Sequence, residues 1–305
     1  MTEFSKNSNE LRINMENDLT IFSLGEKSTK LIGENPQLKN TVSTFTTEGP
    51  ILDSKKIALL LPGIIHTTQV VFEYQIPVLS KLDHDVIGIN YSNQAYSQDM
   101  LNAQIIDFIT NPKNQAKEIT LVGVSLGAYA IIDLFGKSND GNKLTNVKNA
   151  ILLGTIFSVA DLKNGPFGKA LKLSSKFAHG PTVERFIPLV KRFIRADVLY
   201  AGIDGSRKER LQSERNNLSN KALLDRIEIF GNVGAVEELN NINNVSALFG
   251  WWEDDYASPE AKQRLGSLFP NNEEFTINGH HGWTSSNATQ INEAINRFFY
   301  TKGKK

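Results

Sequence analysis

The sequence predicts an α/β fold in which a mostly parallel central sheet is flanked by helices, and three observations predict it. Short continuous apolar runs have the length of strands and the character of strands that are covered on both faces. Amphipathic helical patterns lie between these runs. Each run ends at glycine, proline or polar residues, as strands do at turns. Alternating strands and helices favour a doubly wound sheet.

The strands can be placed from these runs. The predicted parallel strands are Lys56–Leu61, Asp85–Asn90, Glu118–Val124, Asn149–Gly154, Val245–Trp251 and Glu274–Ile277. Two earlier segments alternate loosely between apolar and polar residues, so we expect antiparallel strands at Leu11–Leu24 and Thr41–Thr47.

Helical patterns fill the connections and one long insertion. One predicted helix gathers on a single face Met100, Leu101, Ile105, Phe108 and Ile109, and the last helix gathers Ile291, Ala294, Ile295, Phe298 and Phe299. The range 157–239 is helical in pattern but contains no strand, so we interpret it as an inserted helical cap. Residues 51–156 and 240–305 then form the core domain, and residues 1–50 form an N-terminal extension with the probable first strands.

Composition narrows the class of protein. The chain has 305 residues, of which 40% are hydrophobic and 22% charged, as is ordinary for a soluble globular protein. It has no cysteine, which excludes disulfides, thiolate catalysis and Cys-ligated zinc. No metal-ligand cluster is evident, so neither a metal nor another cofactor is expected. Residues 1–18 contain no long apolar run, and we expect a cytoplasmic protein.

The formal net charge is zero, yet basic residues gather in the predicted cap. They are Lys163, Lys169, Lys172, Lys176, Arg185, Lys191, Arg192 and Arg195. This basic face is a candidate for contacting an acidic carrier protein or an anionic membrane surface, although it is equally compatible with a solvated surface. Nucleic acid is not an expected partner, because the total charge is balanced and no binding motif is present.

A candidate nucleophile lies in Gly123-Val-Ser125-Leu-Gly127, which follows a predicted strand and precedes a predicted helix at Ala128–Phe135. A serine presented on a sharp strand-to-helix turn needs small residues two positions before and after it, because the turn is strained. Gly123 and Gly127 meet this need. The alternative interpretation is a serine that is merely buried in a tight turn.

A general base must activate this serine, and the five histidines are the candidates. His84 and His179 are expected to be solvated, and His66 could line the site but precedes the serine. His280 and His281 follow the last predicted strand, in a loop that can reach back towards Ser125. We favour His280 because the glycines at 279 and 282 suit a sharp loop, which leaves His281 as the alternate.

The acid that orients the histidine should follow the preceding strand, where Glu253, Asp254 and Asp255 stand together. Asp255 ranks first and Asp254 second, because Pro259 would end the loop and start a helix at its first position. The negative oxygen of the intermediate needs two backbone N–H donors. We expect these from Leu126, directly after the nucleophile, and from Ile64, which follows Pro62-Gly63.

The order serine, acid, histidine, with the motifs LLLPG, GVSLG, WWEDDYASP and NGHHGW, resembles the α/β-hydrolase superfamily over roughly residues 50–300. This resemblance implies an α/β-hydrolase fold with a cap, and the catalytic residues Ser125, Asp255 and His280. The last motif resembles the family form G-H-x-G-[FW], which supports His280. The chain departs from the family pattern at Pro62-Gly63, in place of His-Gly, and at residues 90–94, in place of an aspartate and a glycine-rich turn.

These features predict a serine hydrolase acting on a carboxylic ester, thioester or lactone through an acyl-enzyme. Phenylalanines in the predicted cap could line a tunnel for an apolar acyl group, or could simply pack the cap onto the sheet. The alternatives are an acyltransferase with the same three residues and a non-catalytic binding protein of the same fold.

Overall fold

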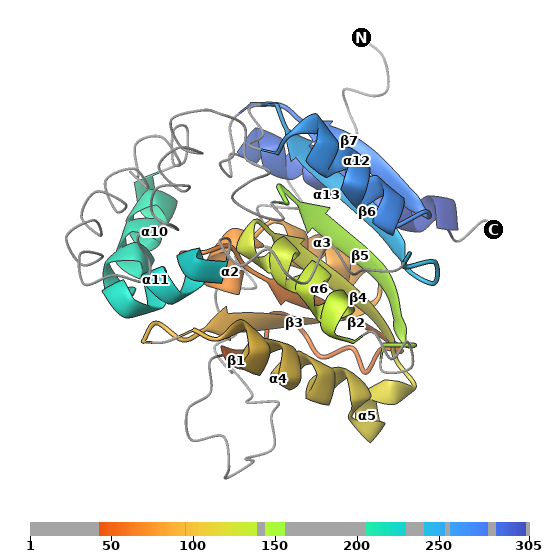
Figure 1. The fold of residues 1–305 in the computed structure, drawn as a ribbon, viewed down its shortest axis with the longest axis horizontal. Helices are drawn as coiled ribbons and strands as arrows, with labels where there is room; N and C mark the ends of the chain where they lie inside the picture. The colour runs from red at the N-terminus through yellow and green to blue at the C-terminus, as the bar shows by residue number, and fades with distance from the viewer. Residues whose placement is uncertain are drawn as a thin grey trace.

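The computed structural model describes residues 43–94, 96–138, 144–155, 205–229, 241–253, 257–279 and 285–302. Its centre is a seven-stranded sheet with the strand order β1-β3-β2-β4-β5-β6-β7 (Figure 1). The strands are β1 Ser43–Thr47, β2 Lys56–Leu61, β3 His84–Tyr91, β4 Glu118–Val124, β5 Val147–Leu153, β6 Ser246–Trp252 and β7 Asn272–Ile277. The predicted parallel strands are therefore all present.

The sheet is parallel from β3 to β7, and β1 pairs with β3 in the antiparallel direction. The prediction for Thr41–Thr47 is thereby confirmed for the part that the structure describes. The predicted strand Leu11–Leu24, like the whole of residues 1–42, lies outside the described residues.

Strand pairing shifts several of the predicted boundaries. The predictions for β2 and β4 agree with the structure at both ends. Strand β3 is one residue longer at each end than its apolar run, because His84 pairs with Lys56 and Tyr91 pairs with Ser43. Strand β5 begins two residues earlier, at Val147, and ends one residue earlier than predicted. Pairing with a neighbouring strand thus lengthens a strand into residues that the hydropathy pattern alone assigns to a turn.

Helices cover both faces of the sheet, as the doubly wound prediction requires. One face packs against α4 Gln98–Thr110, α6 Leu126–Lys137 and α12 Pro259–Leu268, and the other packs against α3 Gln75–Lys81 and α13 Ser285–Lys302. The short helices α2 Thr68–Val71 and α5 Pro112–Gln115 lie in the connections. The sheet therefore has a hydrophobic core on each face, and alternate residues of β2 pack into each: Leu59 and Leu61 into the first core, and Leu60 into the second.

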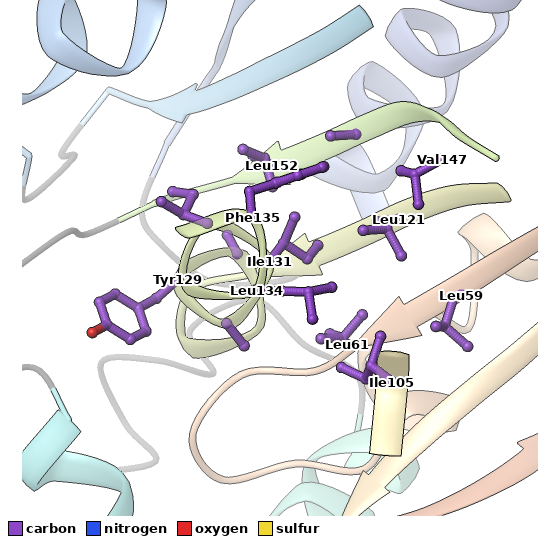
Figure 2. Close-up of a cluster of buried hydrophobic side chains, with 14 of the residues drawn as sticks. Leu59, Leu61, Ile105, Leu121, Tyr129, Ile131, Leu134, Phe135, Val147 and Leu152 are labelled. Carbon is purple, nitrogen blue, oxygen red and sulfur yellow. The ribbon is translucent and has the colours of Figure 1, made fainter. Parts of the chain in front are cut away.

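Helix α6 is the central helix of the first core. Figure 2 shows Ile131 and Leu134 of α6 among side chains of the sheet, including Leu121, while Tyr129 points away from them. Ten consecutive residues of α6, from Leu126 to Phe135, are buried. Burial of this extent stabilises the position at which α6 begins.

One predicted helix face needs correction. Met100 was expected to face the core with Leu101 and Ile105, but it is 38% exposed. The other four predicted residues, Leu101, Ile105, Phe108 and Ile109, do pack in or against the core, and Ile106 packs there as well. At 3.6 residues per turn, Met100 lies about 140° around the helix from Ile105, so its side chain points away from the buried face although Leu101 beside it is buried.

Between β5 and β6, the described residues form two helices, α10 Gly205–Asn217 and α11 Asn220–Glu228, here called the β5–β6 helices. They fall in the range 157–239, the predicted cap, and α10 packs against α2 (Figure 1). Residues 156–204, with the phenylalanines up to Phe193 and the basic face from Lys163 to Arg195, lie outside the described residues. The cap as a whole therefore stays a prediction. Among the described residues, no helix is long and apolar enough to cross a membrane.

The prediction for His84 is also wrong. It was expected to be solvated, but its exposure is 0%, because β3 begins at His84 and not after it. Its Nε2 lies 3.3 Å from the Thr120 hydroxyl, and its ring packs 5.0 Å from that of Phe299. Burial and, to a smaller extent, the nearby Lys56 lower the pKa of His84 from 6.5 to about 4.

We expect this buried histidine to make the fold sensitive to acid. The unfolded chain binds a proton at His84 below pH 6.5, and the folded chain binds it only below about pH 4. Stability therefore falls as the pH drops through this window, by about 1.4 kcal/mol per unit and about 3 kcal/mol in total. Urea unfolding of the wild type and of His84→Gln, between pH 4 and 7, measures the effect. The variant should lose this part of the pH dependence; equal slopes for both proteins would contradict it.

Candidate active site

Ser125 occupies the single-residue turn between β4, which ends at Val124, and α6, which begins at Leu126. Its backbone has φ 52° and ψ −114°, a conformation that residues with a side chain rarely adopt. The Ser125 N–H donates to the Leu153 carbonyl of β5 (2.9 Å), and its own carbonyl accepts from the Tyr129 N–H (3.0 Å). Strand and helix thus hold both ends of a strained turn.

The two flanking glycines allow this turn because backbone passes directly over them. A β-carbon on Gly123 would lie 2.6 Å from backbone atoms of Gly127 and Ala128. A β-carbon on Gly127 would lie 2.1 Å from the carbonyl oxygen of Leu61. Both distances are below any real contact, so only glycine fits at either position. The structure therefore confirms, on steric grounds, the prediction that small residues are required at positions 123 and 127.

The turn lies where the winding of the sheet reverses. Strands β2 and β4 are neighbours, but the chain leaves β2 through α3 on one face and leaves β4 through α6 on the other. Ligands of doubly wound sheets bind at such a point, beyond the carboxyl ends of the strands. The loop after β2 and the turn at Ser125 meet here, because a β-carbon on Gly63 would lie only 3.7 Å from the β-carbon of Ser125.

The two residues expected to donate to an oxyanion therefore lie close together. Leu126 is buried and is the first residue of α6, so its N–H is one of those that a helix leaves without an acceptor of its own. Ile64 follows Gly63 in the loop that crosses over Gly127. This loop, residues 62–67 between β2 and α2, is called the post-β2 loop below.

Helix α10 holds the far end of the post-β2 loop. The Glu214 carboxylate accepts hydrogen bonds from the Thr67 N–H (3.0 Å) and the Thr67 hydroxyl, and it lies 3.4 Å from Nδ1 of His66. Burial alone would raise the pKa of Glu214, but the hydrogen bonds from His66 and Thr67 outweigh it and hold this pKa below its usual range. His66, which the sequence left as a residue that could line the site, is thus engaged with a β5–β6 helix.

The predicted acids and histidines lie outside the described residues: Asp254 and Asp255 fall in 254–256, and His280 and His281 fall in 280–284. The residues that lead into both loops are described, and they are in contact. The Glu253 N–H donates to the Ile277 carbonyl (3.1 Å), and the Gly279 N–H donates to the Glu253 carboxylate (2.8 Å). The two loops therefore leave the sheet from adjacent positions.

Local backbone chemistry shapes these loops as expected. Gly279 has φ +89°, so the chain turns sharply just before His280. Pro259 is the first residue of α12, as predicted, and the Ser258 side chain caps this helix by accepting from the Ala261 N–H. Glu253, one of the three acids considered for the site, uses its carboxylate to accept the hydrogen bond from the Gly279 N–H. The sequence did not predict this hydrogen bond, because the spacing of the two residues does not indicate it.

Comparisons with known proteins point to one fold. No family model matches the chain, and no curated protein matches it. Among solved structures, it is similar to the esterase EaEST from Exiguobacterium antarcticum (TM-score 0.62, 14% identity, 84% of this chain and 95% of that one). It is also similar to MenH from S. aureus (0.61, 15%, 86% and 99%) and to a lipase-esterase related protein from Clostridium acetobutylicum (0.60, 16%, 84% and 99%).

The similarity covers nearly the whole of each of these structures at low sequence identity, so it concerns the fold. It agrees with the observed order of strands and with the helices on both faces of the sheet. The chain has the α/β-hydrolase fold.

Proposed function

We propose that the chain is a serine hydrolase that cleaves a carboxylic ester, thioester or lactone, with Ser125 as its nucleophile. The observation that carries this proposal is the backbone of Ser125, which is held at φ 52° between two glycines that nothing larger could replace. Strain of this kind costs about 1–3 kcal/mol, persists only where the surrounding structure enforces it, and is concentrated at active sites. The turn presents the serine at the point of the sheet where ligands bind in this architecture.

In the proposed reaction, His280 takes the proton of the Ser125 hydroxyl as the oxygen attacks the substrate carbonyl. Asp255 orients the imidazole and stabilises its charged form. His280 then donates the proton to the leaving alcohol or thiol, and the acyl group remains on Ser125. Water, deprotonated by His280, attacks the acyl-enzyme. As the bond from the Ser125 oxygen to the acyl group breaks, His280 returns the proton to this oxygen and the acid is released. The contact between Glu253 and Gly279 supports this assignment, since it starts both loops side by side.

The backbone N–H groups of Leu126 and Ile64 would bind the negative oxygen of the tetrahedral intermediate. Leu126 contributes the additional advantage of a helix N-terminus, where the partial positive charge of α6 favours an anion. Pre-organised donors of this kind stabilise the transition state without having to reorient. We further propose that the substrate carries an apolar acyl group, which the phenylalanines predicted for the cap would contact.

Active-site labelling tests the proposal. The full chain is incubated with a fluorophosphonate probe, and the modified peptide is identified by mass spectrometry. Turnover is measured in parallel on p-nitrophenyl esters of increasing acyl length, on acyl-thioesters and on lactones. We expect stoichiometric labelling of Ser125 and hydrolysis of at least one of these classes. Labelling at another serine, or no labelling and no turnover, would overturn the assignment.

A further inference from the structure

The post-β2 loop is held by a buried arginine from α11. Arg226 is only 1% exposed, and its guanidinium donates to the Ile64 carbonyl (2.5 Å) and to the Ser92 carbonyl after β3 (2.9 Å). It lies over the rings of Tyr91 and Tyr96, 5.4 Å and 5.9 Å from their centroids. One side chain therefore joins a β5–β6 helix to the loops that follow two neighbouring strands.

This arrangement is costly, which argues against an incidental contact. Among the described residues, no carboxylate lies within salt-bridge distance of Arg226, and its Nε has no hydrogen-bond partner. Burying a charge without an opposite charge costs free energy that backbone carbonyls and aromatic faces offset only in part. The other buried residues of α11 are apolar or small: Ala222, Leu223 and Ile227.

The second anchor of the loop is Tyr91. Its hydroxyl donates to the Pro62 carbonyl (3.1 Å), and its ring is the nearer of the two that face Arg226. The Pro62 and Ile64 carbonyls are thus both fixed, and the N–H groups of Gly63 and Ile64 lie between them in the chain. Anchoring both flanking carbonyls restricts the rotation of the peptide unit that carries the Ile64 N–H.

We propose that Arg226 is a positioning residue for catalysis, which together with Tyr91 fixes the orientation of the Ile64 amide towards the oxyanion formed at Ser125. This inference rests on the proposed function. The β5–β6 helices would then contribute to catalysis: α11 sets the geometry of the oxyanion site by holding the post-β2 loop, without contacting the substrate. Asp225 supports the same junction, because its carboxylate accepts from the Tyr96 N–H (3.1 Å).

The prediction concerns kcat rather than substrate binding. Removing the guanidinium in Arg226→Met should lower kcat on a p-nitrophenyl ester about 10- to 100-fold, because small displacements of pre-organised groups cost this much. KM should change less than about twofold, since Arg226 is buried away from solvent. Arg226→Lys, which can reach one carbonyl, should recover part of the loss. Tyr91→Phe, which removes only the hydroxyl, should lower kcat about fivefold.

Two further readouts separate positioning from a merely structural role. A trifluoromethyl ketone that forms a tetrahedral adduct with Ser125 should bind the variants more weakly by the same factor as kcat falls. Amide hydrogen exchange in the post-β2 loop should be faster in Arg226→Met, whether or not the protein turns over any ester. The matched control is Arg210→Met on α10, which removes an arginine bound to Glu73 (3.0 Å) without touching the loop. It should leave kcat unchanged.

The outcomes are distinguishable from those of the proposed function. If the wild type is labelled at Ser125 but folded Arg226→Met or Tyr91→Phe keeps kcat and ketone affinity within twofold, the positioning role is wrong. Should Arg226→Met fail to fold, Arg226→Lys and Tyr91→Phe decide by the same measure. If exchange in the loop rises as expected while the wild type shows neither labelling nor turnover, the proposed function is what fails.

Discussion

Replacing Ser125 with alanine is expected to lower kcat/KM by at least about 10³-fold, because no other group replaces the attacking oxygen. The same substitution should leave the free energy of unfolding nearly unchanged, since alanine bears the same strain at φ 52°. Activity on the best ester substrate and urea unfolding measure the two effects. Activity that survives in the purified variant would show that Ser125 is not the nucleophile.

Ser125→Gly is the matched variant that separates strain from chemistry. Glycine adopts positive φ without cost, so the strain of about 1–3 kcal/mol is relieved. The greater freedom of glycine in the unfolded chain offsets about 0.5–1 kcal/mol of this gain. We therefore expect an inactive protein that is about 1 kcal/mol more stable than Ser125→Ala. A less stable glycine variant would contradict the claim that this turn stores strain.

Gly127→Ala is expected to damage both stability and activity. The added methyl group would lie 2.1 Å from the Leu61 carbonyl oxygen and 2.7 Å from that of Pro62, and neither backbone atom can rotate away. The start of α6 must then move from the end of β2, at a cost of about 3 kcal/mol. This movement separates the Leu126 and Ile64 amides, so kcat should fall about 100-fold in the folded protein.

The control for this variant is Gly266→Ala in α12. A β-carbon on Gly266 meets nothing closer than 3.7 Å, and alanine favours a helix over glycine by about 0.5–1 kcal/mol. We expect this variant to be fully active and slightly more stable. Thermal unfolding and ester hydrolysis of both alanine variants test the contrast, and similar behaviour of the two would contradict the steric role of Gly127.

The fold and the serine turn were predictable because their causes are local in sequence. The strands are continuous apolar runs, and β2 and β4 end where Lys56–Leu61 and Glu118–Val124 end. The need for Gly123 and Gly127 follows from the strand-to-helix turn itself. The error at His84 arose where a neighbouring strand decided the outcome: this residue is buried because it pairs with Lys56, not because its own segment is apolar.

The residues that hold the site are of a different kind. Arg226 and Glu214 form hydrogen bonds with backbone groups of the post-β2 loop. No sequence pattern indicates such bonds, because almost every residue has a backbone carbonyl and N–H that could take part. The one available signal was the position of Arg226 three residues after Leu223 and four after Ala222, on the apolar face of α11. An arginine there would ordinarily be assigned to solvent.

By itself, the sequence determined the class of the sheet, the strained turn at Ser125 and the order of serine, acidic loop and histidine loop. Only the tertiary structure decided that the departures from the family pattern, at Pro62-Gly63 and at residues 90–94, are joined through Tyr91 and Arg226. The physical reason is distance along the chain. Residues 62, 91 and 226 meet because the sheet and α11 bring their backbones together, and no local pattern records that meeting.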